Sequence, residues 1–173
     1  MTLDSFFKKM IFEPLKMDDT YFYLPEEKES RLVTLYAGNE DKDIKKSDGT
    51  ESDIYLDNPN YPISGAKTMF SGGAGLSSTA YDYSLFLSML LNEGKYDEQR
   101  LLSQNSVKLM RTALIDTDSD GNSDFGLGFD VITHPKQSNE LSSVGSYSWG
   151  GAFYTTYWID PQNKLIGIFM SQV

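Results

Sequence analysis

The chain has 173 residues, of which 39 % are hydrophobic and 13 % aromatic. This composition is sufficient for one packed core and argues against global disorder. Its formal net charge of −10 leaves no basic stripe to neutralise phosphates, which argues against nucleic acid and against an anionic membrane surface as partners. The absence of cysteine excludes disulfides and thiolate chemistry, and no apolar run reaches the roughly 18 residues of a membrane helix.

The first residues of the chain have the apolar periodicity of an amphipathic helix. Apolar residues between Thr2 and Ile11 recur at helical spacing with charged residues on the other face, and Pro14 is expected to end this helix. From Tyr21 to Phe70 the pattern is broken, which predicts a long surface loop over residues 21–70 with one or two short strands such as Arg31 to Tyr36. A loop of this length inside a compact domain is usually functional or a mobile cover.

Two further helices are expected in the middle of the chain. A glycine turn at residues 71–76 precedes the first, for which Thr79 is the expected N-cap and Asp82 its capping-box partner. Ser103 is expected to cap the second, which runs through Thr112. The first helix is expected to bury an apolar face made of Tyr83, Phe86, Leu87, Met89, Leu90 and Leu91.

Strand patterns fill the C-terminal third. Residues 125–133 are expected to form one strand, and residues 145–160 and 164–173 an antiparallel pair. Pro161 is placed for a type I turn between the two strands of that pair. No internal repeat and no domain boundary is apparent, so residues 1–173 are expected to form a single domain.

The stretch Trp149-Gly150-Gly151-Ala152 is the strongest candidate site. Small residues beside a large aromatic residue on a strand let a substrate lie against bare backbone, where N–H groups can donate hydrogen bonds.

Two serine motifs and the one histidine are weaker candidates. Ser64 and Lys67 match Ser-x-x-Lys, which places a lysine one helical turn from a nucleophile, but a glycine lies inside the motif and Pro62 just before it, so we regard it as a chance match. Ser103 also matches Ser-x-Asn but is better explained as an N-cap. His134 lacks a Gly-x-Ser-x-Gly partner and is expected at the surface.

Metal and cofactor motifs are sparse. The alternating carboxylates from Asp116 to Asp124 resemble the first half of a calcium loop, yet Leu127 stands where a bidentate glutamate belongs, so a calcium site and an acidic turn both remain open. The glycines at residues 72–75 lack the lysine of a phosphate-binding loop, and Gly126-Leu127-Gly128 is a weak dinucleotide signal. We therefore expect no cofactor and no other metal.

Four segments taken in order resemble the C-terminal half of the serine beta-lactamase-like hydrolases, a family of class C beta-lactamases, DD-peptidases and related esterases. They are Met1 to Thr20, Gly72 to Asp82, Phe125 to Phe129 and Trp149 to Gln172. The resemblance implies an α+β fold, with an antiparallel sheet flanked by helices, as one part of the beta-lactamase/transpeptidase-like fold. It also implies a location in the cell envelope or outside the cell.

The same resemblance assigns roles to the candidate site. Trp149-Gly150-Gly151 corresponds to the family's third motif in its tryptophan form, and the N–H of Ala152 would be the second oxyanion donor. Tyr154 stands where glycine is common and would narrow the acyl pocket. The family's Ser-x-x-Lys and Tyr-x-Asn should precede the first segment, so the chain is expected to be a C-terminal fragment that is inactive alone. Its parent would act on a small amide or ester, and lactam, peptide and ester hydrolases of the family share these motifs.

Two alternatives and one assembly state remain open. The same scaffold could be a non-catalytic domain that binds a peptidoglycan-like peptide or a protein partner, or a calcium-stabilised structural domain. In the family a strand from the N-terminal portion flanks the strand that corresponds to residues 164–173. Without it, the apolar edge of that strand is expected to pair with a second copy, giving a homo-oligomer.

Overall fold

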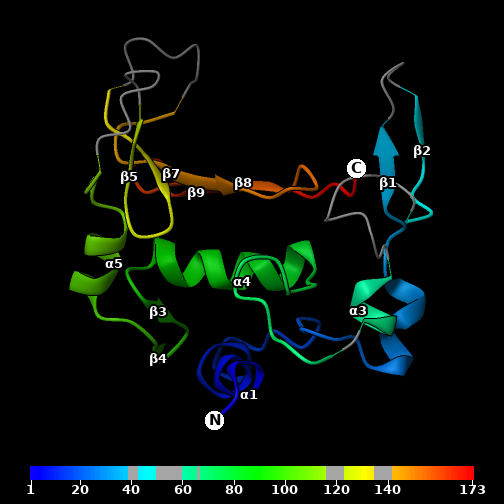
Figure 1. The fold of residues 1–173 in the computed structure, drawn as a ribbon. Helices are drawn as coiled ribbons and strands as arrows, with labels where there is room; N and C mark the ends of the chain where they lie inside the picture. Colours follow the sequence, from blue (N-terminus) through cyan, green and yellow to red (C-terminus); the bar gives the residue numbers. More distant parts are fainter. Residues whose placement is uncertain (39–42, 50–59, 66, 116–122, 135–141) are drawn as a thin grey trace.

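The fold is described from a computed structural model of residues 1–38, 43–49, 60–65, 67–115, 123–134 and 142–173. Five antiparallel strands form the main sheet in the order β5-β6-β7-β8-β9, and two short hairpins, β1-β2 and β3-β4, lie apart from it. The helix α4 packs against β8 and β9, and the N-terminal helix α1 lies beneath α4, which gives three layers (Figure 1). The predicted α+β class is confirmed.

The strands are short. The main sheet consists of β5 (Ser123–Phe125), β6 (Asp130–Ile132), β7 (Tyr147–Gly150), β8 (Thr156–Asp160) and β9 (Leu165–Phe169). The two hairpins pair β1 (Tyr36–Gly38) with β2 (Ile44–Lys46) and β3 (Lys95–Tyr96) with β4 (Gln99–Arg100). The helices are α1 (Leu3–Phe7), the π-helical turn η1 (Lys8–Phe12), α2 (Glu13–Leu15), the 3-10 helix η2 (Glu26–Arg31), α3 (Tyr61–Ser64), α4 (Ala80–Leu91) and α5 (Gln104–Met110). None of these helices is both long and apolar enough to cross a membrane.

The N-terminal helix continues through Pro14, contrary to the expectation that Pro14 ends it. The π-helical turn η1 comes first, and α2 then begins at Glu13, so that Pro14 falls in the first turn of α2. A proline is tolerated there because no N–H is needed at that position. The helical segment ends at Lys16, which adopts the left-handed conformation with φ 60°.

The N-terminus of α4 confirms one half of the predicted capping box. The Thr79 side chain accepts a hydrogen bond from the N–H of Asp82 at 3.1 Å. The Asp82 carboxylate instead accepts the N–H of Asp19 at 2.7 Å and the hydroxyl of Thr20 at 2.8 Å. The predicted return bond to Thr79 is therefore replaced by a connection to a segment more than sixty residues earlier.

Two predicted strands are in fact hairpins. Residues 125–133 turn back at Gly126–Gly128, where Gly128 has φ +88°, so β5 and β6 pair with each other. Residues 145–160 likewise form β7 and β8, joined by a turn, so the predicted pair consists of three strands. The pairing of β8 with β9 across Pro161 is confirmed. Arg31 ends η2 and β1 begins at Tyr36, so residues 31–36 are not a strand.

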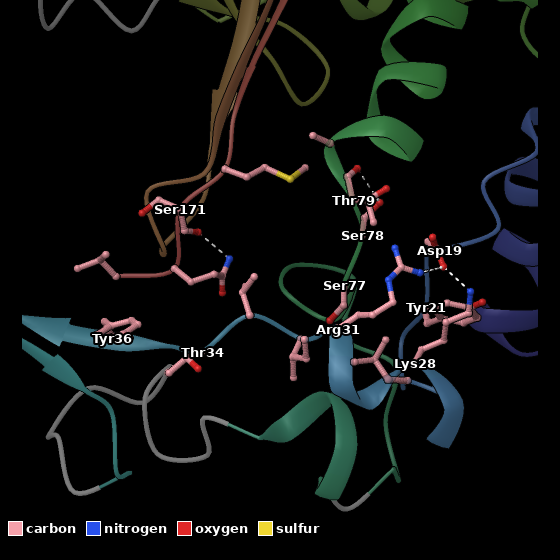
Figure 2. A pocket seen from close by; sticks show the side chains of 17 residues that line it. Asp19, Tyr21, Lys28, Arg31, Thr34, Tyr36, Ser77, Ser78, Thr79 and Ser171 are labelled. Atoms are coloured by element: carbon pink, nitrogen blue, oxygen red, sulfur yellow. Dashed lines mark hydrogen bonds and ion pairs between the residues drawn. The ribbon is translucent and has the colours of Figure 1, made fainter.

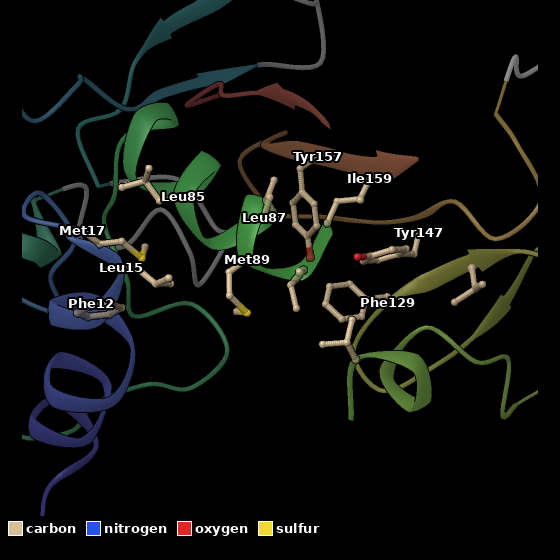
Figure 3. Close-up of a cluster of buried hydrophobic side chains, with 13 residues drawn as sticks. Phe12, Leu15, Met17, Leu85, Leu87, Met89, Phe129, Tyr147, Tyr157 and Ile159 are labelled. Carbon is tan, nitrogen blue, oxygen red and sulfur yellow. The ribbon is translucent and has the colours of Figure 1, made fainter. Parts of the chain in front are cut away.

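The main core lies between α4 and the sheet (Figure 3). Leu85, Leu87, Met89 and Leu90 of α4 are buried, whereas Tyr83, Phe86 and Leu91 are only half-buried. The sheet contributes Tyr147, Tyr157 and Ile159, and Leu15 joins from the N-terminal segment. Each large apolar side chain that is fully buried stabilises the fold by about 1.5–3 kcal/mol. This layer fixes the position of β7 and β8, which hold the candidate site.

The opposite face of the sheet carries exposed apolar side chains. Trp158, Leu165 and Phe169 are 46 %, 58 % and 58 % exposed. The helices α1, α4 and α5 all lie on the other side of the sheet (Figure 1). The Trp158 indole lies over Gly167, because a Cβ atom added there would come within 2.0 Å of the ring.

Candidate functional site

The candidate residues lie where β7 turns into β8. Trp149 pairs with Tyr157 and Gly150 with Thr156, and the chain then leaves the ladder. The N–H of Gly151 donates to the carbonyl of Thr155 at 2.8 Å, and the N–H of Tyr154 donates to the carbonyl of Gly151 at 3.1 Å. These two bonds close a tight turn over residues 151–155, which presents Ala152 to solvent.

The N–H of Ala152 is an open donor of this turn, and the N–H of Phe153 is a second one. Within the part of the chain that the structure describes, no group accepts a hydrogen bond from either of them. The two glycines before Ala152 are exposed, and a Cβ atom at Gly150 or Gly151 would meet its nearest neighbours at 3.6 Å and 3.8 Å, which is ordinary contact. The fold therefore does not require glycine at either position. What the glycines provide is bare backbone beside a free N–H donor.

Trp149 borders the turn with half of its surface exposed. Its ring meets Phe125 of β5 edge-on, with the ring centroids 5.1 Å apart. Tyr154 closes the turn in the left-handed conformation with φ 58°, and its side chain is exposed. The turn is thus flanked by two aromatic side chains that the rest of the fold does not bury.

A pocket of about 500 Å³ lies between the start of α4, the helix η2 and the segment that follows β9 (Figure 2). The Thr155 hydroxyl donates to the carbonyl of Ser171 at 3.2 Å, which connects the turn to the wall of this pocket. The polar lining includes Asp19, Lys28, Arg31, Ser77 and Ser78. The apolar lining is supplied by Leu24, Leu32, Val33, Met170 and Val173.

The charged group in this pocket is a carboxylate between two cations. One oxygen of Asp19 accepts from Lys28 Nζ and from Arg31 Nη1, each at 2.7 Å. The hydrogen bonds from Arg31, then from Lys28, lower the pKa of Asp19, and Asp19 in turn raises the pKa of both cations. The three side chains carry a net charge of +1 in a chain whose total is −10. Sequence reasoning missed them because no local motif links residues nine and twelve positions apart in an irregular segment.

The other sequence candidates lie apart from the turn. Ser64 ends α3 with its hydroxyl on the carbonyl of Asn60 at 3.3 Å, and Lys67 follows with φ 54° and its ammonium group 5.8 Å from the Tyr23 ring centre. Because the helix ends between them, they do not share the helical turn that a Ser-x-x-Lys nucleophile needs. Ser103 is confirmed as the N-cap of α5.

The remaining candidates do not add to the site. His134 is exposed, as expected. The run Asp116 to Asp124 lies outside the described residues except for its last two, so the calcium loop stays untested. Among the described residues, no cluster of three histidine or carboxylate side chains could hold a metal ion. Gly126 is a packing glycine, since a Cβ atom there would lie 2.3 Å from the carbonyl oxygen of Met110.

Comparisons with known proteins agree with this architecture. A family model described as Beta-lactamase matches residues 1–173. Protein Rv1367c of Mycobacterium tuberculosis is 31 % identical over 175 residues, which cover 94 % of this chain and 41 % of that protein. The chain thus spans less than half the length of this relative.

Solved structures share the fold. EstCE1, described as a hydrolase with promiscuous acyltransferase activity, superposes with a TM-score of 0.81 at 22 % identity, over 98 % of this chain and 45 % of that one. Simvastatin synthase (LovD) from Aspergillus terreus superposes with a TM-score of 0.77 at 20 % identity, again over 98 % and 45 %. At 22 % and 20 % sequence identity, the similarity to these two structures establishes a shared fold.

Proposed function

Because the chain belongs to the beta-lactamase family of serine hydrolases, we propose that it forms the oxyanion-binding part of an enzyme that cleaves an amide or ester through an acyl-enzyme. The open N–H of Ala152 carries this proposal. It lies beside two exposed glycines and an exposed tryptophan, at the end of the strand β7, whose Tyr147 is part of the buried core. A donor fixed in this way stabilises a developing oxyanion without reorganising during the reaction.

The chemical role follows from acyl transfer. Attack of a serine hydroxyl on a carbonyl carbon produces a tetrahedral intermediate whose oxygen carries a negative charge. The Ala152 N–H would donate to that oxygen, and Trp149 would pack against the substrate. Removing one such donor typically lowers the rate about 100- to 1000-fold.

The isolated chain is inactive under this proposal, because it lacks Tyr-x-Asn. Of its two Ser-x-x-Lys matches, Ser64 and Lys67 do not lie on one helix, and Ser5 and Lys8 are both exposed on the N-terminal helical segment. Nitrocefin and p-nitrophenyl acetate serve as lactam and ester probes. We expect hydrolysis at the buffer rate for the chain and for Ser64→Ala alike. Turnover above buffer that Ser64→Ala abolishes would show that the chain carries its own nucleophile.

The donor itself can be tested without turnover. Methylphosphonate mimics the charged oxygen of the intermediate, and the amide resonances of the chain can be followed by ¹H–¹⁵N NMR during a titration. We expect the Ala152 amide to shift more than the Gly151 amide, which already donates to Thr155 and serves as an internal control. An Ala152 shift no larger than that of Gly151 would contradict the assigned role.

A non-catalytic binding domain is the second candidate, and the pocket beside Ser171 favours it. Lys28 and Arg31 both pair with Asp19, so the three side chains carry one net positive charge. This charge could be paired with the terminal carboxylate of a bound peptide. Calorimetry with D-alanyl-D-alanine and with its C-terminal amide would test this function. Binding of the acid alone, lost in Arg31→Ala, would support it, whereas equal results for acid and amide would count against it.

A further inference from the structure

Trp149 lies where the strand β7 has only one neighbouring strand left. It pairs with Tyr157 of β8, whereas the pairing of β7 with β6 ends one residue earlier, between Ser148 and Asp130. The two residues that follow Trp149 are glycines, which have no side chain to support an indole. Its own strand therefore leaves several staggered rotamers of the Trp149 side chain open, and a contact from elsewhere has to select one of them.

Phe125 of β5 supplies that contact. Its ring and the Trp149 ring have centroids 5.1 Å apart and an angle of 62° between their planes, which is the edge-on geometry that aromatic pairs favour. Among the residues that the structure describes, no second ring forms such a pair with Trp149. We refer to Phe125 and Trp149 together as the aromatic pair.

The backbone of Phe125 is anchored on both sides. On one side Phe125 pairs with Asp130 of β6. On the other side its N–H donates to the carbonyl of Ile115 at 2.9 Å, and its own carbonyl accepts the N–H groups of Leu114 and Ile115 at 3.0 Å and 3.1 Å. Gly126, the next residue, is packed too closely for a Cβ atom. A ring on a backbone held in this way has little freedom to move and can keep a neighbouring ring in one orientation.

We propose that Phe125 is a positioning residue of the proposed oxyanion site: its ring holds the Trp149 indole beside the turn of Ala152, where the indole contacts an apolar group of the substrate. Phe125 itself acts only through Trp149. This inference rests on the proposed function and adds a substrate class to it, namely an ester or amide that carries a neutral apolar group, aromatic or alkyl, next to the reacting carbonyl.

The charges around the aromatic pair favour a neutral group over an anionic one. The five strands of the main sheet, all within the described residues, contain Asp124, Asp130 and Asp160 and no lysine, arginine or histidine. Asp124 precedes Phe125 along β5, and Asp130 lies opposite both Phe125 and Ser148 in the ladder. An anionic group on the substrate would be repelled by these carboxylates, and no cation of the sheet would pair with it. An apolar group avoids this repulsion and buries surface against the two rings.

Four phosphonates separate the aromatic pair from the oxyanion donor. Methylphosphonate, phenylphosphonate, phosphonoacetate and 2-aminoethylphosphonate share one anionic head group and differ in the substituent that would meet Trp149. Their dissociation constants are measured from the Ala152 amide shift in ¹H–¹⁵N spectra and from Trp149 emission in a Trp158→Phe background. We expect phenylphosphonate to bind about fivefold more tightly than methylphosphonate, and phosphonoacetate to bind more weakly than either. Equal binding of the phenyl and methyl compounds, or tightest binding of 2-aminoethylphosphonate, would overturn the apolar substrate class.

Three variants test the positioning role. Phe125→Leu keeps an apolar side chain but removes the ring, so we expect the preference for the phenyl compound to fall from about fivefold to about twofold or less. Phe125→Tyr restores a ring and should restore the preference. Phe129→Leu is the matched control, because it removes a buried ring that packs against Tyr147. It should lower the melting temperature and leave the preference intact.

The response to methylphosphonate separates this inference from the proposed function. The Ala152 amide should shift with methylphosphonate in all three variants, because that interaction needs no aromatic ring. A preference for the phenyl compound that survives Phe125→Leu, or that Phe129→Leu abolishes to the same extent, would show that Phe125 only stabilises the fold. An Ala152 amide that responds to none of the four compounds would refute the proposed function itself, and this inference with it.

Discussion

Replacing Asp82 with alanine is expected to destabilise the chain strongly. The carboxylate of Asp82 is buried, and a single oxygen of it, Oδ2, accepts both the N–H of Asp19 and the hydroxyl of Thr20. Hydrogen bonds to a charged acceptor contribute about 1.5–3 kcal/mol each, and the two bonds share one atom, so we expect a loss of about 3 kcal/mol. The Thr79 cap survives, because it uses only the backbone N–H of residue 82.

The free energy expected to be lost in Asp82→Ala can be compared with the total free energy of unfolding. Domains of this size unfold at a cost of about 5–15 kcal/mol, so the loss is a large fraction of the stability. One kcal/mol corresponds to about 2–4 °C in a chain of this length, which predicts a melting temperature lower by about 6–12 °C. Urea unfolding and calorimetry measure the two quantities independently.

Asp82→Asn separates charge from geometry. The asparagine oxygen can occupy the position of Oδ2 and accept both donors without charge, so about half of the alanine effect is expected. Ser84→Ala on the same helix removes a hydroxyl that donates only to the carbonyl of Tyr81, and its effect should stay within about 0.5 kcal/mol. If Asp82→Ala were equally mild, or if asparagine were as damaging as alanine, the two bonds would not stabilise the fold as argued.

Three further changes have defined outcomes. The Tyr147 hydroxyl has no hydrogen-bond partner among the described residues, and burial raises its pKa to about 12, so Tyr147→Phe should stabilise the chain by about 1 kcal/mol in urea unfolding. Gly167→Ala should displace the Trp158 indole and cost about 1 kcal/mol, with a red shift of emission in the Trp149→Phe background. Because the folded pKa of Asp19 is lowered, its contribution to stability is present above the unfolded pKa and is lost as the pH falls through the folded one. The wild type should therefore lose more thermal stability than Asp19→Asn as the pH falls below the ordinary aspartate value of 3.8.

Features governed by neighbouring residues were predictable from the sequence. The caps Thr79 and Ser103 need only a hydroxyl and an N–H a few residues away, and both were found as expected. The hairpins inside residues 125–133 and 145–160 were missed, since strand propensity does not reveal where a short strand turns back. The sequence predicts that the Asp82 carboxylate bonds to the backbone N–H of Thr79, its nearest donor along the chain. Tertiary packing instead brings the N–H of Asp19 within hydrogen-bond distance of that carboxylate.

Glycine shows why the candidate site was visible in the sequence and the pocket was not. Gly126 is required by the fold, because a carbonyl oxygen would collide with its Cβ atom, whereas Gly150 and Gly151 have room for one. A glycine that packing does not require leaves backbone exposed to whatever approaches the strand, and two of them in succession beside a tryptophan form a pattern that sequence alone displays. The pocket depends on Asp19, Lys28 and Arg31, which tertiary structure brings together with the start of α4 and the segment after β9. A site built on one strand is therefore readable from its residues, and a site built between elements is readable only once those elements have been placed.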